Sequence, residues 1–125
     1  MLTQTKDQVW QQTFEQVALT TDALGKRIDI GIMGLVLALN AYGIKTTASC
    51  EGHLDHGNPY PWVWVEKSSG EALSRMVKAF GGNLKISQIF DDTYQLTSST
   101  SRLSEKQTEM QQFAEFLRDQ FFEED

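Results

Sequence analysis

The chain has 125 residues, 40% of them hydrophobic, so it can bury a core of its own and we expect one domain over residues 1–125. Seventeen acidic residues against eleven basic ones give a net charge of −6, and no Lys/Arg cluster is larger than the pair Lys26-Arg27. This composition argues against long nucleic acid as a partner, which normally requires a basic stripe, and no apolar run approaches the ~20 residues of a membrane span.

The first half of the chain predicts two helices and a strand. Apolar residues recur at helical spacing over residues 5–18 and, more strongly, over residues 28–42, where they occupy so much of the helix that we expect burial on most sides. Gly43 is well placed to end this second helix, because glycine accepts the left-handed conformation. A short β-rich run over residues 44–49 predicts a strand, and the Gly and Pro residues within 50–61 predict a loop.

The second half of the chain alternates between strand and helix patterns. The expected elements are a strand over residues 62–66, a helix over 68–80, a hairpin of strands over 84–90 and 93–97, and a helix over 104–122. Both helices begin with a capping-box pattern, Ser68 with Glu71 and Ser104 with Gln107. The element order ααββαββα predicts an α+β fold, with a mixed sheet of about four strands and helices packed on it.

The most informative segment runs from Thr46 to His53 and reads Thr-Thr-Ala-Ser-Cys-Glu-Gly-His. It holds the only cysteine and one of two histidines, and it follows a predicted strand, where open α/β sheets commonly bind ligands. Cys50 can act as a nucleophile or a contact residue, and His53 as an acid–base or anion-binding group. We therefore predict Cys50 and His53 as catalytic residues. The alternatives are a small buried core cysteine and a surface histidine without a function.

Further residues are expected to bind a ligand beside this pair. Hydroxyl groups and backbone N–H groups in a turn suit an anion, and the carboxylate of Glu51 or Asp55 can orient His53 or hold a cation. The predicted ligand-binding residues are Asp29, Thr47, Ser49, Glu51, Gly52 and Trp62. Asp29 also lies at a helix start, where capping is the simpler role.

Trp62 and Trp64 alternate with Val63 and Val65, so the two pairs face opposite sides of a strand. If the tryptophans face the loop, they can stack on a flat ligand. The interpretation that we favour is that they cover the sheet beneath a helix.

A metal site is a separate hypothesis. Cys50, His53 and His56 form the spacing C-x2-H-x2-H, with Asp55 between the histidines. Structural zinc usually needs four ligands with two or more thiolates, which one cysteine cannot supply. A three-ligand catalytic site stays open, but its ligands would be packed unusually tightly, and we assign no metal site from the sequence. The pattern leaves the cofactor unknown.

The stretch from Lys26 to His53 resembles the tRNA wybutosine-synthesis methyltransferase family. In that family a lysine-led turn, an Asp and an apolar helix ending in Asn precede Thr-Thr-Ser-Ser-Cys-x-Gly-Arg; here Asp29 leads such a helix to Asn40. The chain also resembles small bacterial proteins with a Ser-Cys-Glu-Gly-His motif followed by Pro-Trp-Val. The resemblance covers roughly a quarter of the chain. It implies a fold of that family, a pocket around Asp29, Ser49, Cys50 and Gly52, S-adenosylmethionine and a modified tRNA base. His53 replaces the family's arginine.

Three functions follow as hypotheses. The first is a cytoplasmic domain with a small-molecule ligand or a reaction at the Ser49–His53 loop; the single cysteine suits a reducing compartment, and the first residues lack a signal-peptide pattern. The second is a non-catalytic interaction module or homo-oligomer, such as a homodimer, suggested by aromatic residues near both ends: Trp10, Phe14, Phe121 and Phe122. The third is a methyltransferase-like protein dependent on S-adenosylmethionine.

Overall fold

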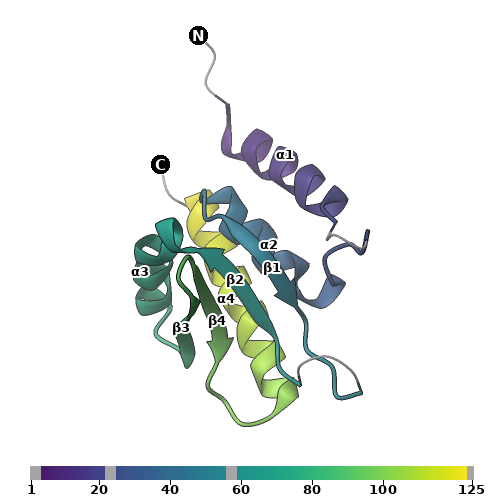
Figure 1. Cartoon of the computed structure of the whole chain (residues 1–125). Helices are drawn as coiled ribbons and strands as arrows, with labels where there is room; N and C mark the ends of the chain where they lie inside the picture. Colours follow the sequence, from purple (N-terminus) through teal and green to yellow (C-terminus); the bar gives the residue numbers. More distant parts are fainter. Residues whose placement is uncertain (1–3, 22–24, 56–58, 124–125) are drawn as a thin grey trace.

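The computed structural model describes residues 4–21, 25–55 and 59–123, and its elements follow the predicted order ααββαββα (Figure 1). The helices are α1 (Lys6–Leu19), α2 (Ile30–Ala41), α3 (Gly70–Phe80) and α4 (Leu103–Glu123). The strands are β1 (Thr46–Cys50), β2 (Trp62–Glu66), β3 (Leu84–Phe90) and β4 (Thr93–Ser98). The α+β class predicted from the sequence is confirmed.

The four strands form one sheet in the order β1-β2-β4-β3, and every neighbouring pair is antiparallel. The expectation of a mixed sheet is therefore corrected. Strands β2 and β3, which α3 connects, run in the same direction but do not pair, because β4 returns through the hairpin and inserts between them. This arrangement is a split βαβ unit. It leaves β1 at one edge of the sheet.

The hydrophobic core lies between one face of the sheet and the helices. Val63, Val65 and Leu96 are fully buried on that face, and residues of α2 and α4 pack against them. Trp62 and Trp64 alternate with the valines and lie on the opposite face, with ring centroids 4.8 Å apart. The interpretation that the tryptophans lie beneath a helix is therefore wrong, since the smaller β-branched residues occupy that position.

The predicted capping boxes do not form. Helix α3 begins at Gly70 after a 3-10 turn, and its N-cap Ser69 makes no side-chain cap; the Ser69 hydroxyl instead accepts a hydrogen bond from the Lys45 N–H. Ser104 lies inside α4 rather than at its cap, because that helix already begins at Leu103. The side chain of Gln107 is thereby available for a contact described below.

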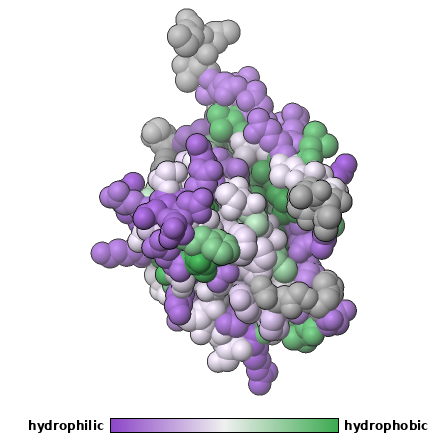
Figure 2. All heavy atoms as spheres, viewed as in Figure 1, coloured by the Kyte–Doolittle hydropathy of each residue, from purple (hydrophilic) through white to green (hydrophobic). Residues whose placement is uncertain are grey.

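The face of the molecule in Figure 2 is mainly hydrophilic, with apolar atoms in separate groups. The large hydrophobic side chains that remain exposed are Phe14, Leu19, Ile30, Leu54, Phe90 and Phe122. In the described part of the chain, no helix combines the length and apolar character needed to cross a membrane.

Candidate functional site

A cavity of about 360 Å³ lies between the outer edge of β1 and the connection from α1 to α2. Strand β1 forms one wall, and the opposite wall comes from residues on either side of an isolated bridge between Thr21 and Arg27. The lining residues include most of the predicted site: Asp29, Thr47, Ser49, Cys50, His53 and Trp62.

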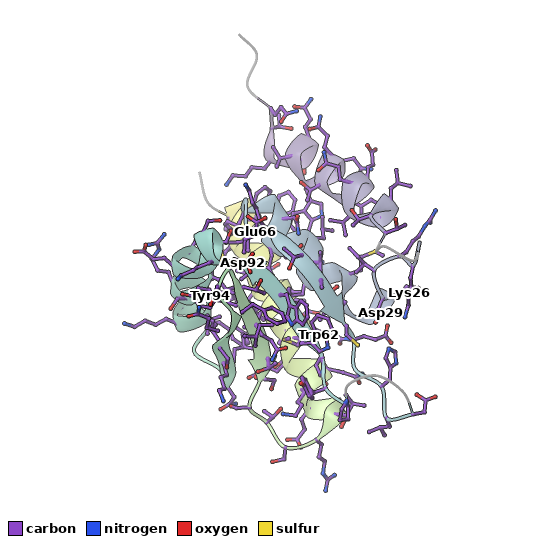
Figure 3. The ribbon with its side chains drawn as sticks, in the orientation of Figure 1. Lys26, Asp29, Trp62, Glu66, Asp92 and Tyr94 are labelled. Atoms are coloured by element: carbon purple, nitrogen blue, oxygen red, sulfur yellow. The ribbon has the colours of Figure 1, made fainter. Side chains whose placement is uncertain are left out.

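Three of these side chains converge at one end of the cavity. Asp29, Cys50 and His53 each offer a donor atom, and these atoms all lie within 4.8 Å of one another. His53 Nε2 is 3.5 Å from Asp29 Oδ2, and both side chains are largely buried, with 21% and 13% of their surface exposed. In Figure 3, Asp29 and Lys26 lie together on the α1–α2 connection, and Trp62 lies on the neighbouring sheet. The cysteine and histidine predicted to act together are therefore brought together, with Asp29 as a third member.

A bulge in β1 determines the side of the sheet to which Cys50 points. The pairing of β1 with β2 shifts between Thr46 and Ala48, so Thr47 is the extra residue. Without this shift, Cys50 would share the face of the buried valines; with it, Cys50 lies opposite Trp62 on the other face. The bulge therefore places the thiol beside the indole at the cavity.

The turn after Cys50 depends on Gly52, which has a φ of +88°. A Cβ at this position would lie 2.8 Å from Leu103 Cδ1 and from backbone atoms of Tyr60 and Pro61. The Gly52 N–H donates to Cys50 Sγ over 3.4 Å. Glycine is thus required both by the conformation and by the close packing, and its amide points to the thiol.

Gln107 of α4 holds the same turn from the other side. Its Nε2 donates to the carbonyl oxygens of Glu51 and Gly52, at 2.9 and 3.4 Å. The predicted capping box assigned this glutamine to its own helix, so the sequence pattern missed its contact with the loop.

The Asp29 and Glu51 carboxylates each make the contact expected of the other: Glu51 binds the first turn of α2, and Asp29 lies beside His53. Asp29 is the N-cap residue of α2 but makes no side-chain cap; its Oδ2 accepts the Glu51 N–H at 3.1 Å. The Glu51 carboxylate instead accepts the Gly31 N–H in the first turn of α2, also at 3.1 Å. Glu51 therefore anchors the loop to the helix and does not line the cavity, nor does Gly52. Asp29 is left facing His53.

The charge on Asp29 is stabilised by its surroundings. Burial raises the pKa of its carboxyl group, but the Glu51 backbone N–H, the Lys26 ammonium 3.6 Å away and the His53 side chain together lower it further, so the pKa lies below the ordinary value of 3.8. Asp29 is therefore an anion at neutral pH. Lys26 is 63% exposed, so its contact with this carboxylate is open to solvent.

The structure places further residues at the site. Asn40 Nδ2 donates to the hydroxyl of Thr46 at 2.9 Å and so ties the far end of α2 to β1. Lys26, Arg27, Thr20 and Thr21 complete the cavity wall. Thr20 and Thr21 could not be predicted as site residues, because they follow α1 and are far from the Thr46–His53 segment in the sequence. Of the remaining predicted metal-ligand pattern, Asp55 is exposed and His56 lies outside the described residues.

Comparisons of this chain with protein-family models, with curated proteins and with solved structures find no match.

Proposed function

We propose that the cavity beside β1 binds a small-molecule ligand and that Cys50 and His53 carry its chemistry. The observation that supports this most is the convergence of Asp29, Cys50 and His53 within 4.8 Å on the wall of a cavity of about 360 Å³. A buried filler cysteine would be enclosed by aliphatic neighbours, whereas Cys50 is half-buried and lines a cavity.

The roles of the three groups follow from their chemistry. Cys50 is the nucleophile or the main ligand contact, and His53 accepts or returns the proton. Asp29 orients the imidazole and stabilises its charged form, as a carboxylate does for a catalytic histidine. Trp62 supplies a flat surface, and the cationic Arg27 at the opposite wall suits a ligand with an anionic group.

Alkylation kinetics of the single cysteine test this proposal. We expect iodoacetamide at neutral pH to modify Cys50 in the folded, chelator-treated protein faster than a model thiol, because His53 can take up the thiol proton when no metal is bound. His53→Gln should slow the reaction several-fold, whereas Gln111→Ala, an exposed change on α4, should leave the rate unchanged. A slow reaction that accelerates only in denaturant would overturn the proposal.

The resemblance to the wybutosine-synthesis methyltransferases supplies one ligand to try. Asp29, Ser49 and Cys50, which that resemblance assigns to a pocket, line this cavity. S-adenosylmethionine that binds the folded protein raises the melting temperature by mass action. No shift at millimolar cofactor would remove the methyltransferase hypothesis and leave the ligand-binding proposal to the alkylation test.

A further inference from the structure

We propose that Asp29, Cys50 and His53 bind one zinc ion, with the fourth coordination position facing the cavity. This inference rests on the proposed function, because it uses the same three side chains. In the zinc-bound form Cys50 and His53 would be ligands of the ion, and Cys50 would react as a free thiol only after the ion is removed. Its third ligand is Asp29 from the start of α2, which the sequence pattern C-x2-H-x2-H did not include.

The donor set selects the metal. One thiolate, one imidazole and one carboxylate form a mixed soft and hard set that suits Zn²⁺, whereas Ca²⁺ and Mg²⁺ prefer oxygen ligands alone. Three protein ligands with an open position are typical of catalytic zinc, and four protein ligands are typical of structural zinc. The single cysteine, which excludes a structural site, is therefore compatible with a catalytic one.

The distances also fit. Ligand atoms at ~2.0–2.3 Å from a tetrahedral ion lie roughly 3.3–3.8 Å from one another. His53 Nε2 and Asp29 Oδ2 are already 3.5 Å apart, and no pair among the three donors exceeds 4.8 Å. The site therefore needs side-chain adjustments of about 1 Å or less to close on an ion.

Hydrogen bonds around the ligands match those that support a metal. The Gly52 N–H points to Cys50 Sγ, and the Glu51 N–H points to Asp29 Oδ2. Such bonds orient metal ligands and stabilise their anionic forms. Both N–H groups come from the turn that Gln107 holds, so the fold prepares two of the three ligands together.

One charge opposes the ion. The Lys26 ammonium is 3.6 Å from Asp29 Oδ1 and must move away or share the carboxylate when a cation binds. Because 63% of its side chain is exposed, it can turn into solvent. Removing this charge should therefore strengthen metal binding without disturbing the fold.

Titration of the full-length, chelator-treated protein with Co²⁺ and Zn²⁺ tests the site. We expect one Co²⁺ per chain, with visible bands of tetrahedral cobalt and a near-ultraviolet thiolate-to-cobalt band, and displacement of that cobalt by Zn²⁺. Cys50→Ser should abolish the thiolate band. Asp29→Asn and His53→Gln should each weaken Zn²⁺ binding by about 100-fold or more. Residues that only support metal ligands typically contribute about 10- to 100-fold in affinity, and a direct ligand should contribute at least as much. Lys26→Met should tighten binding, and Asp91→Asn, in the exposed turn between β3 and β4, should leave it unchanged.

Circular dichroism of each variant separates loss of a ligand from loss of the fold. Absence of a thiolate band in the folded wild-type protein, or equal Zn²⁺ affinity in Cys50→Ser, would overturn the zinc site. If Cys50 then still alkylates rapidly in the presence of chelator, the proposed function survives; if it neither binds zinc nor alkylates, both proposals fail.

Discussion

Asp29 contributes most to the site through its charge, and this makes its effect on stability dependent on pH. Its pKa is lowered in the folded state, so its contribution is fully present above the unfolded pKa and is lost as pH falls through the folded value. We expect Asp29→Asn to lower the free energy of unfolding at pH 7, and this difference from wild type to shrink below about pH 4. Urea denaturation in chelator at several pH values measures it.

Asp91→Asn, in the exposed β3–β4 turn, is the matched control for that series. Its free energy of unfolding should stay close to that of the wild-type protein at every pH. A constant gap between wild type and Asp29→Asn from pH 7 to pH 3 would contradict the electrostatic explanation and would leave only a packing effect.

Two features of Gly52 disfavour a side chain, its positive φ and its close neighbours. Comparison with Gly43, which shares only the first feature, measures the two effects separately. Gly43 has a similar φ of +85°, but a Cβ there would meet nothing within 4 Å. We expect Gly43→Ala to cost about 1 kcal/mol from backbone strain and Gly52→Ala roughly 2–4 kcal/mol, because overpacking is added. Midpoints of urea unfolding followed by tryptophan fluorescence give both values, and equal losses would show that the packing around Gly52 relaxes at no cost.

At the scale of elements, α4 supports the turn after β1 through the hydrogen bonds of Gln107 and through the packing of Leu103 against Gly52. Gln107→Ala removes the donor to the Glu51 and Gly52 carbonyl oxygens and should lower the free energy of unfolding by about 1 kcal/mol. The amides of residues 51–53 should exchange with solvent faster in this variant, because the turn loses its anchor. Hydrogen exchange read by mass spectrometry tests this. Gln111→Ala, exposed on the same helix, should change neither quantity.

The elements themselves were predictable because their signals are local. The alternation of valine and tryptophan in β2 and the broad apolar pattern of α2 depend only on residues within the element, and both are confirmed. Which face of β2 is buried could not be predicted correctly from the sequence. The two tryptophans were expected to cover the sheet beneath a helix, but the valines occupy that face and the indoles lie on the opposite one.

The site was predictable only in part, since its contacts join distant segments. Cys50 and His53 are three positions apart and stood out as a motif. Asp29 was predicted at the site with capping as its simpler role, and Gln107 was assigned to the cap of its own helix; their partners at Glu51 lie 22 and 56 positions away. A capping pattern describes what a side chain can do locally, and tertiary contacts that bury the same polar group can outweigh it.

For the whole molecule, the aromatic residues near both ends are explained within one chain. Trp10 contacts Phe121 and Phe122 with ring centroids 5.4 and 5.3 Å apart, and these two phenylalanines contact each other. Helix α1 is thereby joined to the last turns of α4. The surfaces that suggested a homodimer are thus partly used for folding. Phe14, however, remains 44% exposed beside a groove between α1, α2 and α4.

We therefore expect a monomer, and light scattering on a size-exclusion column decides the point. The expected mass is 14.2 kDa, independent of protein concentration in the micromolar range. Phe14 and Ile30 line this groove together, but the other large exposed apolar residues, Leu19, Leu54, Phe90 and Phe122, do not. Stable dimers normally bury about 800 Å² per partner around a contiguous apolar centre. A mass near twice the expected one that returns to the monomer value in Phe14→Ser would contradict this and would establish the groove as a dimer interface. Phe90→Ser, on the edge strand β3 and outside this groove, is the control for a general effect of removing an exposed aromatic residue.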